Sequence, residues 1–158
     1  MKTIRLTIAA VTLSLSSFIA SAQTTAPALT AYYNVKDALV STDAAKAKTS
    51  AAELVAALGQ VNAANLSATD KKAMATAKTK AADISKSTDV DVQREAFEGL
   101  STSMIALAKA TKPAKTYVQY CPMAAEGKGA SWLSDKREVR NPYYGDKMLK
   151  CGSVKEEI

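Results

Sequence analysis

Residues 88–113 decide the fold of this chain, and they read TDVDVQREAFEGLSTSMIALAKATKP. Thr88 and Asp89 are polar residues of the kind that precede a helix, and Pro113 is a residue that stops one. Between them, apolar side chains recur at helical spacings, at Val90, Phe97, Leu100, Met104 and Leu107. This pattern predicts an amphipathic helix that buries one face against other elements.

Three further apolar stripes precede this one along the chain. They run over residues 29–40, 47–61 and 74–84. Ser41-Thr42-Asp43 supplies N-capping residues before the second stripe. Ser67-Ala68-Thr69-Asp70 resembles a capping box before the third, with Asp in place of Glu. We therefore expect a mainly α fold, an up-and-down four-helix bundle with short polar connections.

The composition changes after residue 115. Four of the six tyrosines and the only tryptophan lie in this last part of the chain. Residues 117–120 and 130–133 are typical of short strands, so we expect a small irregular C-terminal segment with a short β-hairpin. A single helical-bundle domain over residues 29–158 would then carry a sulfur and aromatic motif at 117–152.

The N-terminus has the composition of a secretory signal peptide. Lys2 and Arg5 form a positive region, an apolar run follows over 8–19, and Ala20-Ser21-Ala22 is a cleavage site of small residues. The apolar run is shorter than the about 20 residues of a transmembrane helix. We expect cleavage after Ala22, a short leader over 23–28, and an exported protein, periplasmic or secreted, without membrane insertion.

Charge and composition exclude several classes of function. The formal net charge is +6, and removal of the signal peptide lowers it to +4. The lysines are scattered over alanine-rich stretches, which is typical of solvated helix faces, so we expect no nucleic-acid partner. The chain contains no histidine. This excludes Ser-His-Asp and Cys-His nucleophiles and histidine-based metal sites, and we expect the protein not to be an enzyme.

Two mirrored sulfur motifs carry the most specific chemistry. Cys121-Pro122-Met123 opens the C-terminal segment, and Met148-Leu149-Lys150-Cys151 closes it. The spacing in the first motif places both sulfurs on one side of an extended segment, and the spacing in the second does so on a helical turn. Thiolates from Cys121 and Cys151 with thioethers from Met123 and Met148 would form a soft metal site that suits Cu(I) or Ag(I).

Neighbouring side chains fit such a site. The ring of Trp132 or Tyr120 would cap a bound ion, because an aromatic face attracts cations. Lys147 and Lys150 would lower the pKa of a nearby thiol and favour the thiolate that binds metal.

The same two cysteines also fit a structural disulfide, which is the default for two cysteines in an oxidising compartment. A Cys121–Cys151 bond would close a loop of about 30 residues and stabilise the fold by about 3–4 kcal/mol in the chain-entropy model. The chain would then be a disulfide-stapled helical protein-interaction module with no metal. The residues leave both interpretations open.

Four blocks of sequence follow one another in a specific order: Tyr120–Ala124, Gly129–Ser134, Asn141–Gly145 and Met148–Gly152. With Lys36–Val40 upstream, they resemble an exported domain-of-unknown-function family that is frequent in Bacteroidetes. The resemblance covers roughly residues 30–152. Domains of that family are also attached to periplasmic adaptor subunits of copper/silver efflux systems similar to CusB.

The resemblance implies a helical bundle with a C-terminal sulfur and aromatic motif, and a link to heavy-metal handling. We therefore expect a periplasmic protein that binds Cu(I) or Ag(I) as a buffer, carrier or efflux accessory, with a periplasmic efflux component as its partner.

Overall fold

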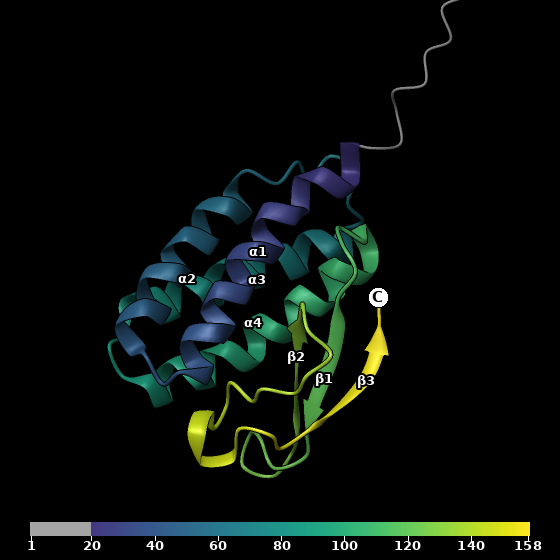
Figure 1. Ribbon diagram of the computed structural model, residues 1–158. Helices are drawn as coiled ribbons and strands as arrows, with labels where there is room; N and C mark the ends of the chain where they lie inside the picture. Colours follow the sequence, from purple (N-terminus) through teal and green to yellow (C-terminus); the bar gives the residue numbers. More distant parts are fainter. Residues whose placement is uncertain (1–19) are drawn as a thin grey trace, which may run out of the picture.

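The computed structural model describes residues 20–158 and shows four helices followed by a small sheet (Figure 1). The helices are α1 (Ala20–Val40), α2 (Ala44–Gly59), α3 (Ala68–Lys86) and α4 (Val90–Thr111). The strands are β1 (Tyr117–Cys121), β2 (Ala130–Ser134) and β3 (Ser153–Glu157), and a 3-10 turn, η1 (Gly145–Met148), precedes β3. The predicted mainly α fold is confirmed.

The predicted helix starts are confirmed by their caps. The Asp43 carboxylate accepts a hydrogen bond from the Lys46 backbone N–H at 2.9 Å, at the start of α2. Ser67 accepts one from the Asp70 backbone N–H at 3.1 Å, and its hydroxyl donates to the Asp70 carboxylate at 2.6 Å. Asp89 caps α4. Each cap satisfies N–H groups that the first helical turn leaves without a partner.

The first helix begins earlier than the sequence suggested. Residues 23–28, expected to be a leader, belong to α1, and within them Thr25 and Ala28 are buried. Pro27 lies inside α1, where it removes one backbone N–H from the helical hydrogen bonds. The predicted signal peptide lies outside the described residues, except for its last three, which form the first turn of α1.

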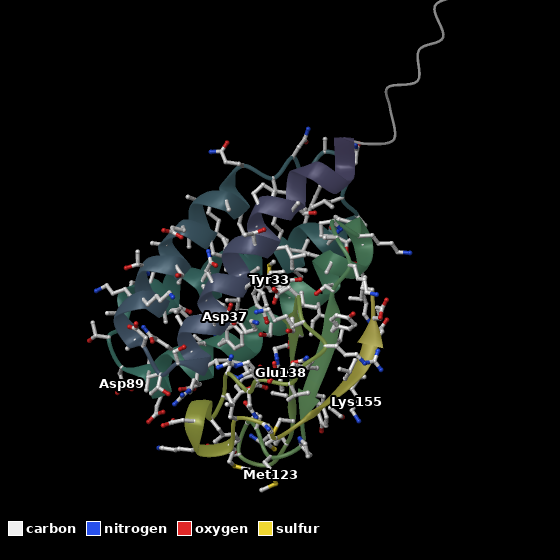
Figure 2. All side chains as sticks on the ribbon, viewed as in Figure 1. Tyr33, Asp37, Asp89, Met123, Glu138 and Lys155 are labelled. Atoms are coloured by element: carbon white, nitrogen blue, oxygen red, sulfur yellow. The ribbon has the colours of Figure 1, made fainter. Side chains whose placement is uncertain are left out.

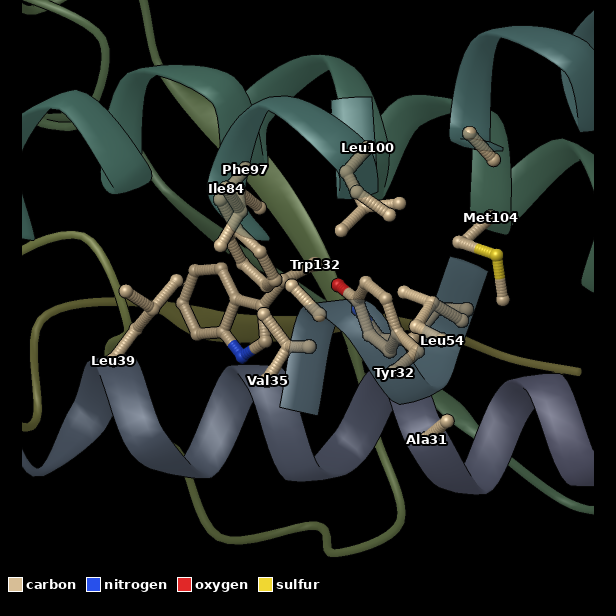
Figure 3. Close-up of a cluster of buried hydrophobic side chains, with 14 of the residues drawn as sticks. Ala31, Tyr32, Val35, Leu39, Leu54, Ile84, Phe97, Leu100, Met104 and Trp132 are labelled. Atoms are coloured by element: carbon tan, nitrogen blue, oxygen red, sulfur yellow. The ribbon is translucent and has the colours of Figure 1, made fainter. Parts of the chain in front are cut away.

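Each helix packs against the next one in the chain, and α1 also packs against α4, so the four form a closed bundle. Its core contains side chains from all four helices and from β2 (Figure 3). The largest of them are fully buried: Tyr32, Leu39, Leu54, Ile84, Phe97, Leu100 and Trp132. Alanines at the helix contacts, such as Ala51, Ala77 and Ala81, have no exposed surface, which lets the helix backbones approach closely.

The sheet is antiparallel with the order β2-β1-β3. The expected hairpin is therefore formed by β1 and β2, and a third strand, β3, pairs with the other edge of β1. Gln119 lies opposite Trp132 in the hairpin, and Tyr120 lies opposite Ser153 in the second pair. Thr116 and Ile158 exchange both backbone hydrogen bonds at the end of the second pair. β2 packs on α4, and the sheet therefore covers one side of the bundle.

The segment between β2 and β3 is fastened to the bundle by Arg94 of α4. Its guanidinium is buried and donates to the carbonyl oxygens of Pro142 at 3.0 Å and Leu39 at 3.2 Å. It also donates to the Thr42 hydroxyl at 3.1 Å. One side chain therefore joins α4, the end of α1 and the C-terminal segment.

Candidate functional site

The sheet brings the two cysteines together at one end of the molecule. Cys121 is the last residue of β1, and one residue, Gly152, separates Cys151 from the start of β3. Because β1 and β3 run antiparallel, the end of one strand lies beside the start of the other. The two Sγ atoms are 2.8 Å apart, and both thiols are free. Cys121 is fully buried, whereas Cys151 is half-buried.

Asn141 fixes the loop that carries Cys151. Its side-chain amide donates to the Cys151 carbonyl oxygen at 2.9 Å, and its backbone N–H donates to the Leu149 carbonyl oxygen at 2.8 Å. Its side-chain oxygen accepts from the Tyr143 backbone N–H at 2.8 Å. Asn141 is fully buried, and its hydrogen bonds hold this loop from the inside.

The contact between the two thiols shifts the pKa of Cys151. The pKa of Cys151 is raised, first by its hydrogen bond to Cys121, then by burial and by the charge that Cys121 can carry. A hydrogen bond from the Met123 backbone opposes this shift and lowers the pKa. Neither Lys147 nor Lys150 is among the causes of this shift, and its direction is opposite to the lowering of the pKa that the sequence suggested.

Both methionines of the motifs lie at the surface near the cysteine pair. Met123 is 52% exposed and Met148 is 38% exposed. Figure 2 shows Met123 at the end of the molecule, pointing away from the helices. The Met148 carbonyl oxygen accepts a hydrogen bond from the Cys151 backbone N–H at 3.0 Å. All four sulfur residues therefore gather at one end, where the cysteine sulfurs touch and the thioethers face solvent.

Trp132 and Tyr120, the two aromatic residues suggested as caps for a bound ion, lie in different surroundings. Trp132 is fully buried, with its ring 5.9 Å from that of Tyr143, and a Cβ atom at Gly152 would be 3.1 Å from its Cη2. Its ring edge thus reaches the residue after Cys151. Tyr120 precedes Cys121 in β1, and neighbouring residues of a strand point to opposite faces. Its ring is covered by Lys155, whose Nζ is 5.3 Å from the ring centroid.

A groove of about 380 Å³ flanks this end of the molecule. Its walls are one face of α4, the β1–β2 loop and the tyrosines before η1: Arg94, Glu95, Glu98, Ala125, Glu126, Lys128, Tyr143 and Tyr144. The Tyr144 hydroxyl donates to the Met123 carbonyl oxygen, which ties the groove wall to the sulfur motif. The groove was not predicted from the sequence, because glutamates on a helix are typical of any solvated face.

The loop wall of this groove is strained. Ala125 and Glu126 have φ angles of 52° and 57°, and neither is a glycine. Each such residue costs about 1–2 kcal/mol in this left-handed conformation. Residues of this kind cluster at ligand clamps and functional sites, where the surrounding structure holds them.

Among the described residues, no group of three or more His, Cys, Asp or Glu side chains is placed to hold a metal ion. The donor set at the cysteine pair is instead two thiols with two nearby thioethers, which suits soft ions. One ion bound tetrahedrally by both sulfurs, with bonds of about 2.3 Å, requires them about 3.8 Å apart. The pair at 2.8 Å would have to open for this.

One comparison with known proteins gives a match. The family described as "Protein of unknown function (DUF3347)" matches residues 28–116. No curated protein and no solved structure matches the chain. The matched region begins within α1 and ends directly before β1, so it contains most of the helical part and excludes the sulfur motifs. A family of unknown function is thereby confirmed, at the helical part of the chain.

Proposed function

We propose that this chain, which belongs to the DUF3347 family of proteins of unknown function, binds a monovalent soft metal ion, Cu(I) or Ag(I), at its cysteine pair. The observation that carries the proposal is the contact of Cys121 with Cys151, the only two cysteines, 30 positions apart in the chain. Two thiolates at one point form the core of a soft-metal site, because they select Cu(I) over hard cations such as Mg²⁺ or Ca²⁺.

The positions of the two methionines support this function. Methionine commonly fills gaps in a core. Met123 and Met148 instead lie exposed at the surface, one beside each cysteine in the sequence. Cys121 would be the fixed ligand, because it is buried in the sheet, and the half-buried Cys151 would turn to admit the ion. The thioethers would complete or protect the coordination.

The cellular role follows from the predicted export signal. Once cleaved after Ala22, the chain would work in the periplasm as a copper or silver buffer, carrier or efflux accessory, with an efflux component as partner. None of the described helices is long and apolar enough to cross a membrane. The efflux role is proposed on the resemblance of the sulfur and aromatic blocks to domains attached to CusB-like adaptors.

The decisive experiment is an anaerobic Cu(I) competition titration of the fully reduced mature protein against a chromophoric Cu(I) chelator. We expect one Cu(I) per chain. Cys121→Ser and Cys151→Ser should each weaken binding by more than about a hundredfold, and a Met123→Leu/Met148→Leu variant by about tenfold. Met74→Leu, a methionine of α3 far from the motifs in sequence, is the matched control. If a variant that lacks both cysteines bound Cu(I) as tightly as the wild-type chain, the proposal would be wrong.

A second function is favoured by the short distance between the sulfurs. At 2.8 Å they are closer to the about 2.05 Å of a disulfide than to the separation that a shared metal ion needs. The chain would then be a stapled interaction module that binds a partner and no metal. The intact mass of unreduced protein after iodoacetamide treatment separates the two: a disulfide gives no alkyl addition and a mass two hydrogens lighter.

A further inference from the structure

We infer that Cys151 is the entry point for thiol–disulfide exchange with an exported dithiol protein, and that Cys121 is the internal partner that such a protein does not touch. The inference rests on the proposed function only in that a metal-binding pair must be kept as two thiols. Oxidation to a disulfide would close the metal site, and a reducing partner that attacks Cys151 would open it.

The first support is the difference in burial between the two sulfurs. Cys121 has no exposed surface and belongs to the central strand of the sheet, with β2 on one side and β3 on the other. Its neighbour across the hairpin, Ala130, is also buried. Cys151 lies in the loop between η1 and β3 and is half-buried. Exchange requires a thiolate to approach along the S–S axis, so access selects Cys151.

The second support is the way the loop holds Cys151 at the surface. The Asn141 side-chain amide donates to the Cys151 carbonyl oxygen at 2.9 Å, and the Cys151 backbone N–H donates to the Met148 carbonyl oxygen at 3.0 Å. Cys121 is therefore the sulfur that departs when the more accessible Cys151 is attacked.

The third support is the surface around Cys151. Met123 and Met148 are the exposed apolar side chains on this surface, and Lys147 and Lys150 beside them are exposed cations. Apolar contacts with a basic rim suit a protein partner with an acidic face around its reactive cysteine. The lysines also attract an incoming thiolate.

A partner thiolate attacks Cys151 Sγ, the Cys121–Cys151 bond breaks, and its electron pair leaves on Cys121 Sγ, which takes up a proton. The second partner thiol, as its thiolate, then attacks the partner's sulfur in the mixed disulfide and releases Cys151, which is protonated in turn. Two electrons and two protons pass from the partner dithiol to the pair, and the partner becomes a disulfide.

The first test measures access to each sulfur in the reduced state. Purified Cys121→Ser and Cys151→Ser variants are mixed with 5,5′-dithiobis(2-nitrobenzoate), and the release of thionitrobenzoate is followed. The variant that retains Cys151 should react about tenfold faster or more. In concentrated guanidinium chloride both variants should react at similar rates, which shows that the fold causes the difference. Equal rates in folded variants, checked by circular dichroism, overturn the inference.

The second test uses the oxidised wild-type chain, so that no variant of this protein has to fold. A thioredoxin whose second active-site cysteine is replaced by serine is the probe, because it stops at the mixed disulfide. Peptide mapping should place the adduct on Cys151. Three results would each overturn the inference. They are an adduct on Cys121, an adduct on both cysteines equally, and no adduct under conditions in which the same probe traps a linear peptide that contains a disulfide. Neither test contains metal, so failure of the Cu(I) titration leaves their results unaffected.

Discussion

The backbone N–H of Leu133 in β2 donates a hydrogen bond of 3.1 Å to the hydroxyl of Tyr32 in α1, across 101 positions of the chain. The same hydroxyl is 2.7 Å from Ser101 Oγ in α4. Because the Leu133 N–H is the donor to Tyr32, the tyrosine proton is free to go to Ser101. One buried hydroxyl therefore joins the sheet to two helices of the bundle.

Replacement of this tyrosine tests how firmly the sheet is docked. Tyr32→Phe leaves the buried Leu133 N–H without its partner, which should lower the free energy of unfolding by about 1–3 kcal/mol in urea titrations. Tyr33→Phe is the matched control, because it removes a hydroxyl that is bound to Thr116 at 2.6 Å in a half-buried position. A loss for Tyr33→Phe as large as that for Tyr32→Phe would contradict this account.

Gly145 is a position where an added side chain would meet close neighbours. Its φ angle is +59°, and a Cβ atom there would lie 2.5 Å from Thr42 Oγ1 and 2.8 Å from Arg94 Nη2. Gly127 has a φ angle of +83° with nothing within 4 Å of such an atom, so Gly127→Ala measures backbone strain alone. We expect Gly127→Ala to cost about 1 kcal/mol and Gly145→Ala clearly more, by differential scanning calorimetry. Similar losses would mean that the close approach is harmless.

Oxidation of the cysteine pair should stabilise the fold. A disulfide between Cys121 and Cys151 would close a loop of 30 positions, worth about 3–4 kcal/mol in the chain-entropy model. The melting temperature of the oxidised protein should therefore fall on addition of a phosphine reductant. A Cys121→Ala/Cys151→Ala variant should show no such response. A wild-type protein that melts at the same temperature with and without reductant would refute the expected linkage.

The raised pKa of Cys151 makes the stability of the reduced protein depend on pH. The pKa of Cys151 is raised in the folded state, so folding holds the proton more firmly than the unfolded chain does. This contribution is complete below the unfolded pKa of about 8.5 and disappears as the pH rises through the folded pKa. Urea titrations in reductant should show stability falling with pH above that value, with a shallower fall in Cys151→Ser. An identical slope for the variant would exclude this thiol as the cause.

The helical part of the fold was predictable, because its signals are local. Asp43, Ser67 and Asp89 cap helices where the sequence placed polar residues before apolar stripes. β3 was missed for a physical reason: its residues have little apolar pattern, with Val154 as the one apolar residue. The strand forms because the free edge of β1 lies next to it, and a single sequence does not reveal which edges remain free.

The candidate site was predicted in its residues but not in its geometry. The spacing of the motifs named Cys121, Met123, Met148 and Cys151, and the structure gathers them at one end. The direct sulfur contact depends on the β1–β3 register and on the hydrogen bond from Asn141 to the loop that carries Cys151. Neither is a local property of the sequence. The burial of Trp132, which the sequence suggested as an ion cap, likewise results from packing against Tyr143.

The order of the elements along the chain has a consequence for the time at which the sulfurs meet. Cys151 and β3 follow all four helices, whose contacts lie mostly between neighbours in sequence and so form quickly. The pair can close only after β3 has found β1, which in turn rests on a docked hairpin. An intact sulfur contact is therefore a late event of folding, and a chain that has acquired it has already passed through every earlier stage of assembly.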